Sequence, residues 1–429
     1  MKQLFKQIIV AILTWEAQIV LARHKPKIVA VTGSVGKTST KDAIFTALAH
    51  TYHARKSEKS FNSELGVPLT ILGLPTGWSS PIVWMENIVE GFVIALFGKV
   101  YPEWLVLEVG ADRPGDITRL AWLRPHIAVL THFPDVPVHV EFFESPEQVI
   151  AEKRELKKAL RPNGTLIINA DDPKMQDEPI AEGQHRVSYG FGEHAFVRGA
   201  DPTILYADGG IEGMAASVRC QQQVLPLAVR GALGTHQLYP LLAAITVLVS
   251  EGTSLEHALA ALEGHVPPPG RMRVLHGIHG CCLVDDTYNA SPAAVTAGLT
   301  TLPSLSCPGK KIAVLGDMME LGDFSVAEHK KVGELAATTC DALITVGVRM
   351  LAAADAARAA RGSLQRIESC KDTGEALTIL REYVGEGDVV YVKGSQSMRM
   401  ERVVEELLRD PSEAQKVLVR QDKEWKAKG

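Results

Sequence analysis

The sequence predicts an α/β protein with a P-loop central domain, which carries a mostly parallel sheet and a β-rich flap, and a C-terminal Rossmann-like α/β domain. Two observations predict this class. Short, continuously apolar runs alternate with helical periods on both sides of a proline-rich segment. A glycine-rich loop also joins the first of these runs to a helix. Apolar strands separated by helices are typical of a parallel sheet that is covered on both faces.

The proline-rich segment "HVPPPGR", residues 265–271, divides the chain. Its three prolines and its glycine cannot continue a helix, so we expect a stiff hinge. We therefore expect an N-terminal helix over residues 1–26, a central domain over 27–266 with an apolar insertion at about 78–104, and a C-terminal domain over 271–429.

The central domain is predicted to begin with the strand at 27–32 and a helix from Lys37. A helix over 145–160 follows, with Ser145 as its N-cap and Pro146 in its first turn. Alternating short runs with glycine turns over about 187–230 predict the flap. The other predicted strands of this domain lie at 104–110, 126–131 and 164–172, and further helices begin at 236 and 254.

After the hinge the strand–helix alternation restarts, without the glycine fingerprint of dinucleotide-binding folds. The strands are expected in "CCLVDD", "KIAVLG", "DALITV" and "DVVYVKG", and the last residues, "DKEWKAKG", are expected to be frayed.

Composition narrows the class of function. The 429 residues carry a net charge of -5, which argues against a broad nucleic-acid surface. None of the six cysteines forms a C-x-x-C pair, so we expect reduced thiols and a cytoplasmic protein rather than a zinc site.

Two apolar stretches, "IIVAILTWEAQIVLA" at 8–22 and residues 81–104, are interpreted as helices. In the first, Leu4, Ile8, Ile12, Trp15 and Ile19 recur at helical spacing, which predicts one buried face. We expect both helices to pack against the protein or against each other. The alternatives are peripheral contact with the inner membrane face or with a partner protein through 4–22 and 81–99, and membrane spanning.

The loop "TGSVGKTST" carries the first chemistry. Its glycines allow backbone N–H groups to turn toward phosphate oxygens, Lys37 reaches the β- and γ-phosphates, and the Thr38 hydroxyl is placed to bind Mg²⁺. The full Walker pattern has a glycine where Val31 stands, so this loop is a shortened variant. The predicted nucleotide-binding residues of the loop are Thr32, Gly33, Ser34, Val35, Gly36, Lys37, Thr38 and Ser39.

Nine segments, in order along the chain, resemble the Mur ligase superfamily and most closely its MurF type. The most MurF-like are "DDTYNASP", "GDMMELG" and "KGSQSMRME". The others are "VTGSVGKTSTKD", "SFNSELGVPLTIL", "LVLEVGADRPGDI", "HVEFFESPEQVIAEKREL", "GTLIINADDP" and "PGRM".

The resemblance implies an ATP-dependent amide ligase that converts a carboxylate into an acyl phosphate, which an amine then attacks. It implies one Mg²⁺ held by Thr38 and Glu108, and a second Mg²⁺ site with His139 and a carbamoylated Lys153. Lys37, His139, Lys153, Arg271 and Lys393 would be catalytic. His236, Arg271 and Asp286 would contact ATP, and the acceptor and amine would meet Tyr288, Asn289, Ser395 and Arg399.

Two departures from the family pattern stand out. The family segment G-x-H-N-x-x-N reads "GTHQLYP", so Gln237 and Pro240 replace two asparagines, one of which helps to seat the base. The phosphate loop also begins some thirty residues from Met1. We therefore expect one helix in place of the UDP-binding domain, and the two apolar helices to pack where that domain would sit.

The expected activity is the addition of D-Ala-D-Ala, or a related amine, to a cell-wall peptide precursor. The alternatives are a Mur-type ligase that acts on a non-peptidoglycan or lipid-linked acceptor, a P-loop NTPase that serves as a switch or binding module, and a degenerate structural relative. Neither a switch nor a binding module needs the spacing of Lys153 or the motifs of the second domain.

Overall fold

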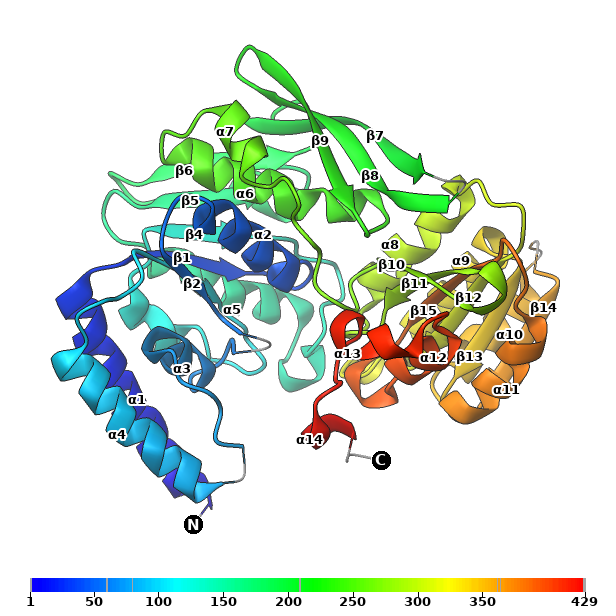
Figure 1. Cartoon of the computed structure of the whole chain (residues 1–429), viewed down its shortest axis with the longest axis horizontal. Coiled ribbons are helices and arrows are strands. Elements are labelled where there is room, and N and C mark those ends of the chain that lie inside the picture. The colour runs from blue at the N-terminus through cyan, green and yellow to red at the C-terminus, as the bar shows by residue number, and fades with distance from the viewer. Residues whose placement is uncertain are drawn as a thin grey trace.

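Two α/β lobes lie side by side in the computed structural model, each built on its own sheet (Figure 1). The structure describes residues 2–58, 61–78, 80–207, 210–360, 362 and 364–426, with side chains from Phe5 onward. The first sheet uses residues between 27 and 230, and the second uses residues between 273 and 393, so the segment 265–271 lies between them.

The first sheet has nine strands in the order β2-β3-β1-β4-β5-β6-β7-β8-β9. Neighbours from β2 to β7 are parallel, whereas β7, β8 and β9 pair antiparallel and form the predicted flap. The strands are β1 (Lys27–Thr32), β2 (Ala54–Lys56), β3 (Trp104–Glu108), β4 (Ile127–Leu130), β5 (Thr165–Asn169), β6 (His185–Gly190), β7 (Val197–Ala207), β8 (Gly210–Cys220) and β9 (Gln223–Arg230).

Both faces of this sheet are covered, which explains why β1 is apolar from Ile28 to Val31. Val29 and Val31 face one core with helix α2 (Lys37–Ala49) and helix α6 (Tyr239–Ser250), whereas Ile28 and Ala30 face another. The second core includes helix α3 (Gly66–Leu72) and helix α5 (Pro146–Lys158). Side chains alternate between the faces of a strand, so a strand buried on both sides shows no polar positions.

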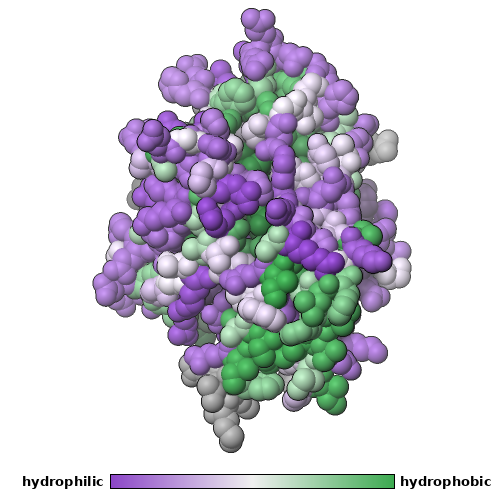
Figure 2. All heavy atoms as spheres, turned by 90° about the vertical axis from the view of Figure 1, so that its left-hand side faces the viewer, coloured by the Kyte–Doolittle hydropathy of each residue, from purple (hydrophilic) through white to green (hydrophobic). Residues whose placement is uncertain are grey.

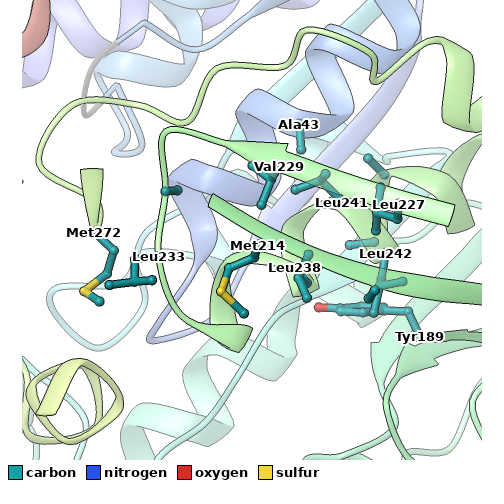
Figure 3. Close-up of a cluster of buried hydrophobic side chains, with 14 of the residues drawn as sticks. Ala43, Tyr189, Met214, Leu227, Val229, Leu233, Leu238, Leu241, Leu242 and Met272 are labelled. Atoms are coloured by element: carbon teal, nitrogen blue, oxygen red, sulfur yellow. The ribbon is translucent and has the colours of Figure 1, made fainter. Parts of the chain in front are cut away.

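The flap is fixed to the lobe by its own apolar face. Figure 3 shows Met214, Leu227 and Val229 of the flap pointing toward Leu241 and Leu242 of α6. All five of these side chains are buried. Helix α7 (Leu255–Ala260), capped by the hydroxyl of Ser254, follows α6. The flap is therefore part of the central lobe, as the sequence predicts.

The second sheet has six strands in the order β10-β11-β15-β12-β13-β14. The Rossmann-like prediction is confirmed, with two strands that the sequence analysis did not predict: β10 (Arg273–His276), an antiparallel edge strand, and the parallel strand β14 at the opposite edge. The parallel strands are β11 (Cys282–Asp286), β12 (Lys311–Gly316), β13 (Ala342–Val346), β14 (Arg366–Cys370) and β15 (Val389–Lys393). The helices are α8 (Pro292–Thr301), α9 (Ser325–Thr339), α10 (Leu351–Ala359), α11 (Thr373–Tyr383), α12 (Glu401–Leu407), α13 (Ala414–Val417) and α14 (Lys423–Lys426).

For residues 422–426, helix α14 corrects the expectation of a frayed segment, whereas residues 427–429 lie outside the described part of the chain. The N–H of Trp425 is capped by the Asp422 carboxylate, and the Trp425 carbonyl accepts a hydrogen bond from Arg399. This short helix is therefore tied to the second lobe by polar contacts that composition does not reveal.

Helices α1 (Lys2–His24) and α4 (Pro81–Phe97) pack against each other at the outer edge of the first lobe, as expected (Figure 1). Helix α1 also packs on α3. The Ser80 hydroxyl accepts a hydrogen bond from the N–H of Val83, and Pro81 occupies the first helical position. Both are ordinary signals of a helix N-terminus.

The predicted buried stripe of α1 is wrong by one position. The buried residues are Ile9, Leu13, Ala17 and Val20, whereas Ile8 is 50% exposed and Trp15 is 49% exposed. Ile12 and Ile19 are only partly buried, and the side chain of Leu4 lies outside the described part. The correct stripe includes Glu16, a charged residue that an apolar-periodicity argument excludes from a core.

Glu16 is fully buried beside Gly91 of α4. A methyl group on Gly91 would lie 2.2 Å from a Glu16 carboxylate oxygen, so only glycine leaves room here. Neither oxygen has a hydrogen-bond partner among the described residues, and burial raises the pKa of Glu16 to about 7. Burial without a partner favours the neutral acid.

The buried carboxyl group of Glu16 predicts that the stability of the packed helices α1 and α4 depends on pH. The folded pKa exceeds the ordinary value of 4.5, so this carboxyl favours folding most below about pH 4.5 and loses that contribution as pH rises through about 7. The difference corresponds to at most about 3 kcal/mol. Glu16→Gln should therefore raise the melting temperature by a few °C at about pH 8 and leave it nearly unchanged at about pH 4. An equal shift at both pH values would contradict this assignment.

Candidate active site

The loop after β1 has the backbone shape of a phosphate cradle. Gly33 has φ 146° and Gly36 has φ 88°, values that favour glycine. A Cβ on Gly33 would lie 2.0 Å from the hydroxyl of Thr131, so the loop passes close to the end of β4. The N–H of Ser34 donates to the carbonyl of His132 at 2.9 Å, which ties the loop to the segment that follows β4, the neighbour of β1 in the sheet. The loop leads directly into the N-terminus of α2.

Lys37 folds back over this loop. Its Nζ donates to the carbonyl of Gly33 at 2.9 Å, and it lies 3.5 Å from that of Ser34. Burial lowers the pKa of Lys37, while the nearby Glu108 carboxylate acts in the opposite direction. Thr38, the next residue, lines the same cavity as Lys37. Ser39 lines a neighbouring cavity, and Thr32 is fully buried at the end of β1.

Glu108 ends β3 beside the loop and has a free coordination position. One oxygen accepts a hydrogen bond from Asn62 at 3.3 Å, whereas Oε2 is buried and has no partner among the described residues. An orphaned carboxylate oxygen in a cavity that the Thr38 hydroxyl also lines is a suitable site for a hard cation such as Mg²⁺. The described residues contain no cluster of three acidic, His or Cys ligands, so the remaining ligands would come from phosphate and water.

A cavity of about 190 Å³ is lined by most of the predicted phosphate and metal residues, but not by Lys153, and both lobes contribute to it. The first lobe contributes the loop, Glu108 and His139, and the second contributes Arg271, Tyr288 and Asn289. The Arg271 guanidinium stacks on the Tyr288 ring at 4.0 Å, and its Nη2 donates to the Thr38 hydroxyl at 3.4 Å. A cation from one lobe therefore reaches the phosphate loop of the other.

His139 bridges the two lobes through carboxylates that the sequence analysis did not assign. Its Nδ1 lies 2.6 Å from Glu320 of the second lobe, and its Nε2 lies 3.4 Å from Asp112. The neighbouring His139 side chain lowers the pKa of Glu320. Both carboxylates lie in segments that resemble the family, "ADRPGDI" and "GDMMELG". The sequence analysis recognised these segments but assigned no role to either carboxylate.

Lys153 is fully buried on α5 rather than part of a solvated face. Its Nζ donates to the Ser34 hydroxyl at 3.2 Å. Burial lowers the pKa of Lys153 well below its ordinary value, and the charge of Lys37 lowers it further. Burial beside the phosphate loop therefore favours the neutral form of this amine, the form in which a lysine is nucleophilic.

A second cavity, of about 280 Å³, adjoins the loop and has the features of a nucleoside site. His236, Arg271 and Asp286, all predicted to contact ATP, line it. Burial lowers the pKa of His236 to about 4, so the imidazole is neutral. Gln237 and Pro240, the departures from the family pattern, line it as well.

Sequence reasoning missed several residues of this second cavity. Tyr239 donates a hydrogen bond to Asp171 at 2.7 Å, and Asn169 lies beside them at the end of β5. The run "INADD" places polar residues directly after an apolar strand, at the edge where ligands of α/β sheets bind. The aromatic partner Tyr239, 68 residues further along the chain, could not be inferred from that run.

The second lobe also contains a buried ion pair. Lys393 lies 2.5 Å from Asp286 and donates to the carbonyl of Asn289 at 3.0 Å. Burial lowers the pKa of Lys393, while Asp286 opposes this change. Lys393 lines the nucleoside cavity rather than the cavity that Tyr288 and Asn289 line.

Two predicted substrate residues serve other contacts. The guanidinium of Arg399 forms a buried ion pair with Glu401 at 2.6 Å and contacts Trp425, and Arg399 lines neither cavity beside the loop. Ser395 accepts a hydrogen bond from the N–H of Met319 at 2.8 Å. In this structure the buried guanidinium of Arg399 is paired with the Glu401 carboxylate, as burial of a charge requires, and its contact with substrate stays a prediction.

Comparisons with known proteins agree with this geometry. Two family profiles match: "Mur ligase middle domain" over residues 92–248 and "Mur ligase, glutamate ligase domain" over residues 270–396. A UDP-N-acetylmuramoyl-tripeptide--D-alanyl-D-alanine ligase of Mycobacterium leprae is 31% identical over 409 residues, covering 89% of this chain and 74% of the relative. The chain belongs to the Mur ligase family.

Two further relatives of the same type support the assignment. The ligase of that name from Bacillus subtilis is 29% identical over 392 residues, 90% of this chain and 76% of its own. The crystal structure of MurF from Thermotoga maritima in complex with ADP superposes with a TM-score of 0.75 at 27% identity, covering 95% of this chain and 84% of that chain. This Mur ligase is therefore an ATP-dependent enzyme that forms C–N bonds.

The free oxygen of Glu108 predicts a strong effect of a small substitution. Glu108→Gln keeps the size of the side chain but removes its charge from the cavity that Thr38 also lines, so the rate of ADP formation should fall by about 100-fold. The measurement is ADP release as a function of Mg²⁺ concentration. Glu90→Gln, an exposed carboxylate on α4, is the matched control and should leave the rate unchanged. Equal Mg²⁺ dependence in Glu108→Gln and the native protein would exclude Glu108 as a ligand.

Proposed function

We propose that this Mur ligase joins D-alanyl-D-alanine to a UDP-N-acetylmuramoyl-tripeptide, with ATP as the energy source. One observation carries the proposal: Arg271 of the second lobe meets Thr38 of the phosphate loop in a cavity that also holds the free oxygen of Glu108. Relatives named for this reaction align with about nine-tenths of the chain, on both sides of that cavity.

The reaction couples ATP cleavage to amide formation. A carboxylate oxygen of the acceptor attacks the γ-phosphorus, the bond to the β-phosphate oxygen breaks, and ADP leaves. The amine nitrogen of the dipeptide then attacks the acyl carbon, loses a proton, and expels inorganic phosphate. Carboxylate and amine do not condense readily in water, because the leaving group is poor and the amine is protonated.

Three cationic side chains are suited to the charge that gathers in this cleft. Lys37 faces the β- and γ-phosphate positions from the first lobe, and Arg271 approaches from the second. Cations that are held in fixed positions in a cleft that excludes water stabilise the negative charge of the transferring phosphoryl group. Lys393, paired with Asp286, contributes from the nucleoside side. The proposal requires closure of the two lobes about residues 265–271 as a step of the cycle.

Mg²⁺ would be held by Thr38 and Glu108, and a second ion by His139 with a carbamate on Lys153. Both ions would neutralise phosphate oxygens when bound. The burial and low pKa of Lys153 support the carbamate, since a neutral amine adds CO₂ and releases one proton, which converts a buried base into an anion. Asp112, whose carboxylate lies 3.4 Å from Nε2 of His139, is a further candidate ligand.

A second candidate acceptor is a lipid-linked or non-peptidoglycan molecule. The exposed apolar surface of α1 and α4 favours this second acceptor. Both helices pack on α3, and α3 follows the loop whose Asn62 donates a hydrogen bond to Glu108. A switch without ligase activity would need neither the buried Lys153 nor Arg271 at the loop. We place the reaction in the cytoplasm, where ATP is available and the free cysteines of the chain stay reduced.

The proposal is tested by supplying ATP, Mg²⁺, UDP-N-acetylmuramoyl-tripeptide and D-alanyl-D-alanine, and by measuring ADP together with the product mass. We expect one ADP for each amide formed. Formation of ADP with a different amine or acceptor would identify another substrate of the same ligase. ADP release that ignores every amine and acceptor would favour the switch.

Lys153→Ala tests the carbamate. Because this change removes an anion near the phosphate loop and leaves a buried cavity, ADP formation should fall by about 100-fold or more and recover in part with short-chain carboxylates. Growth in ¹³C-bicarbonate should give a carbamate carbon signal in the native protein but not in Lys153→Ala.

Lys158→Ala, on an exposed position of the same helix, is the control and should behave as the native protein. An active Lys153→Ala, or the same labelled signal in it, would remove the carbamate from the scheme.

A further inference from the structure

The outer edge of the first lobe exposes a continuous apolar surface. On α4 it consists of Ile82, Met85, Val89, Val93, Leu96 and Phe97, and these six residues are called the apolar face below. Their exposed fractions run from 46% for Leu96 to 71% for Ile82. Figure 2, which views the side of the molecule where α1 and α4 lie, shows a hydrophobic area in its lower half with hydrophilic residues above it. Soluble monomers rarely expose contiguous apolar patches of this kind without a partner.

The apolar face is not explained by the packing of α4 within the chain. The opposite side of α4, with Trp84, Asn87, Gly91 and Ala95, is already buried. Helix α4 is therefore apolar on two sides, with Glu86 and Glu90 exposed along one edge. A helix that is apolar around most of its circumference is expected in a buried or lipid-contacting position.

Helix α1 extends the apolar face. Ile8 and Trp15 are half exposed, and the Trp15 ring contacts Phe92 of α4 at a centroid distance of 5.5 Å. By length and composition, the segment Phe5–His24 could cross a membrane, with a mean hydropathy of 1.5, yet its inner stripe packs against the lobe. Spanning would expose that stripe and the sheet edge beneath it, so contact with a surface is the mode that keeps the lobe intact.

Charged side chains gather at one end of this surface. Arg23, Lys25 and Lys99 are exposed at the C-terminal ends of α1 and α4. The Arg23 guanidinium donates to the carbonyl of Ala95, so the two helix ends are held together. Among the described residues, no carboxylate forms an ion pair with any of the three, and their charge remains available to an anionic surface.

The chemistry of the apolar face favours lipid over protein. Its six side chains offer no hydrogen-bonding group, whereas a specific protein interface carries about one hydrogen bond per 100–200 Å². Lipid chains need none. An apolar helix surface with aromatic residues and adjacent cations is the pattern of helices that lie in the headgroup region of anionic membranes.

We propose that α1 and α4 dock this Mur ligase on the surface of an anionic lipid bilayer, with the apolar face in the interfacial region and Arg23, Lys25 and Lys99 at the headgroups. The edge with Glu86 and Glu90 stays in water. The loop whose Asn62 donates a hydrogen bond to Glu108 leads into α3, and α1 packs on α3. Docking through α1 therefore brings this loop near the bilayer. The proposal does not depend on the identity of the ligase substrates.

The test is sedimentation of the full chain with vesicles of phosphatidylcholine and phosphatidylglycerol, compared with phosphatidylcholine alone. We expect co-sedimentation with the anionic vesicles. Val89→Glu combined with Phe97→Glu should lower the partition coefficient by at least about tenfold, because two charges would have to enter the interface. Lys25→Gln combined with Lys99→Gln should lower it by about tenfold on anionic vesicles, since each cation adds a modest attraction near the surface.

Val326→Glu combined with Val348→Glu is the matched control, since these valines of the second lobe are 60% and 80% exposed. It should bind vesicles as the native chain does. All variants change exposed side chains, so melting temperature and vesicle-free ADP formation should remain native. Failure of the native chain to bind anionic vesicles, or equal loss in the control, would overturn the proposal. Light scattering that shows a dimer split by Val89→Glu and Phe97→Glu would overturn it as well, by assigning the face to a second copy.

Discussion

The contact of Arg271 with Thr38 is the constraint on which the site depends. A triphosphate brings several negative charges into one cavity, and one P-loop with one lysine does not balance them. The second cation comes from the other lobe, and its position is fixed by stacking on Tyr288 and by the start of the second sheet. Gly270, with φ 69°, precedes Arg271, so the chain can turn sharply between hinge and strand. The two lobes form one site only where this arginine reaches the loop.

Much of the fold follows from local signals. Strands β1, β3, β4 and β5 of the first sheet could be predicted because burial on both faces leaves apolar runs, whereas the short polar strand β2 was missed. The helix from Pro146 could be predicted because Ser145 caps it through the N–H of Gln148. The glycine loop could be assigned from sequence because its backbone requires glycine at Gly33 and Gly36. These features depend on residues close in the chain.

Contacts between distant residues could not be predicted in the same way. The buried stripe of α1 contains Glu16, and a periodicity argument cannot know that Gly91 leaves space for a carboxyl group. Arg399 has the spacing of a substrate residue, but its charge is used by Glu401. Tyr239 and Asp171 meet only because α6 packs beside the end of β5. In each case a partner far along the chain decides the role of the side chain.

The pair His139 and Glu320 has a consequence for any ion held by this imidazole. A ligating histidine is oriented by the group that accepts the hydrogen of its other ring nitrogen, and that group tunes the basicity of the ligand. Here the carboxylate that lies 2.6 Å from Nδ1 belongs to the opposite lobe. Separation of the lobes would therefore leave the ring free to rotate and weaken it as a donor, so affinity for the cation would follow the approach of the two halves.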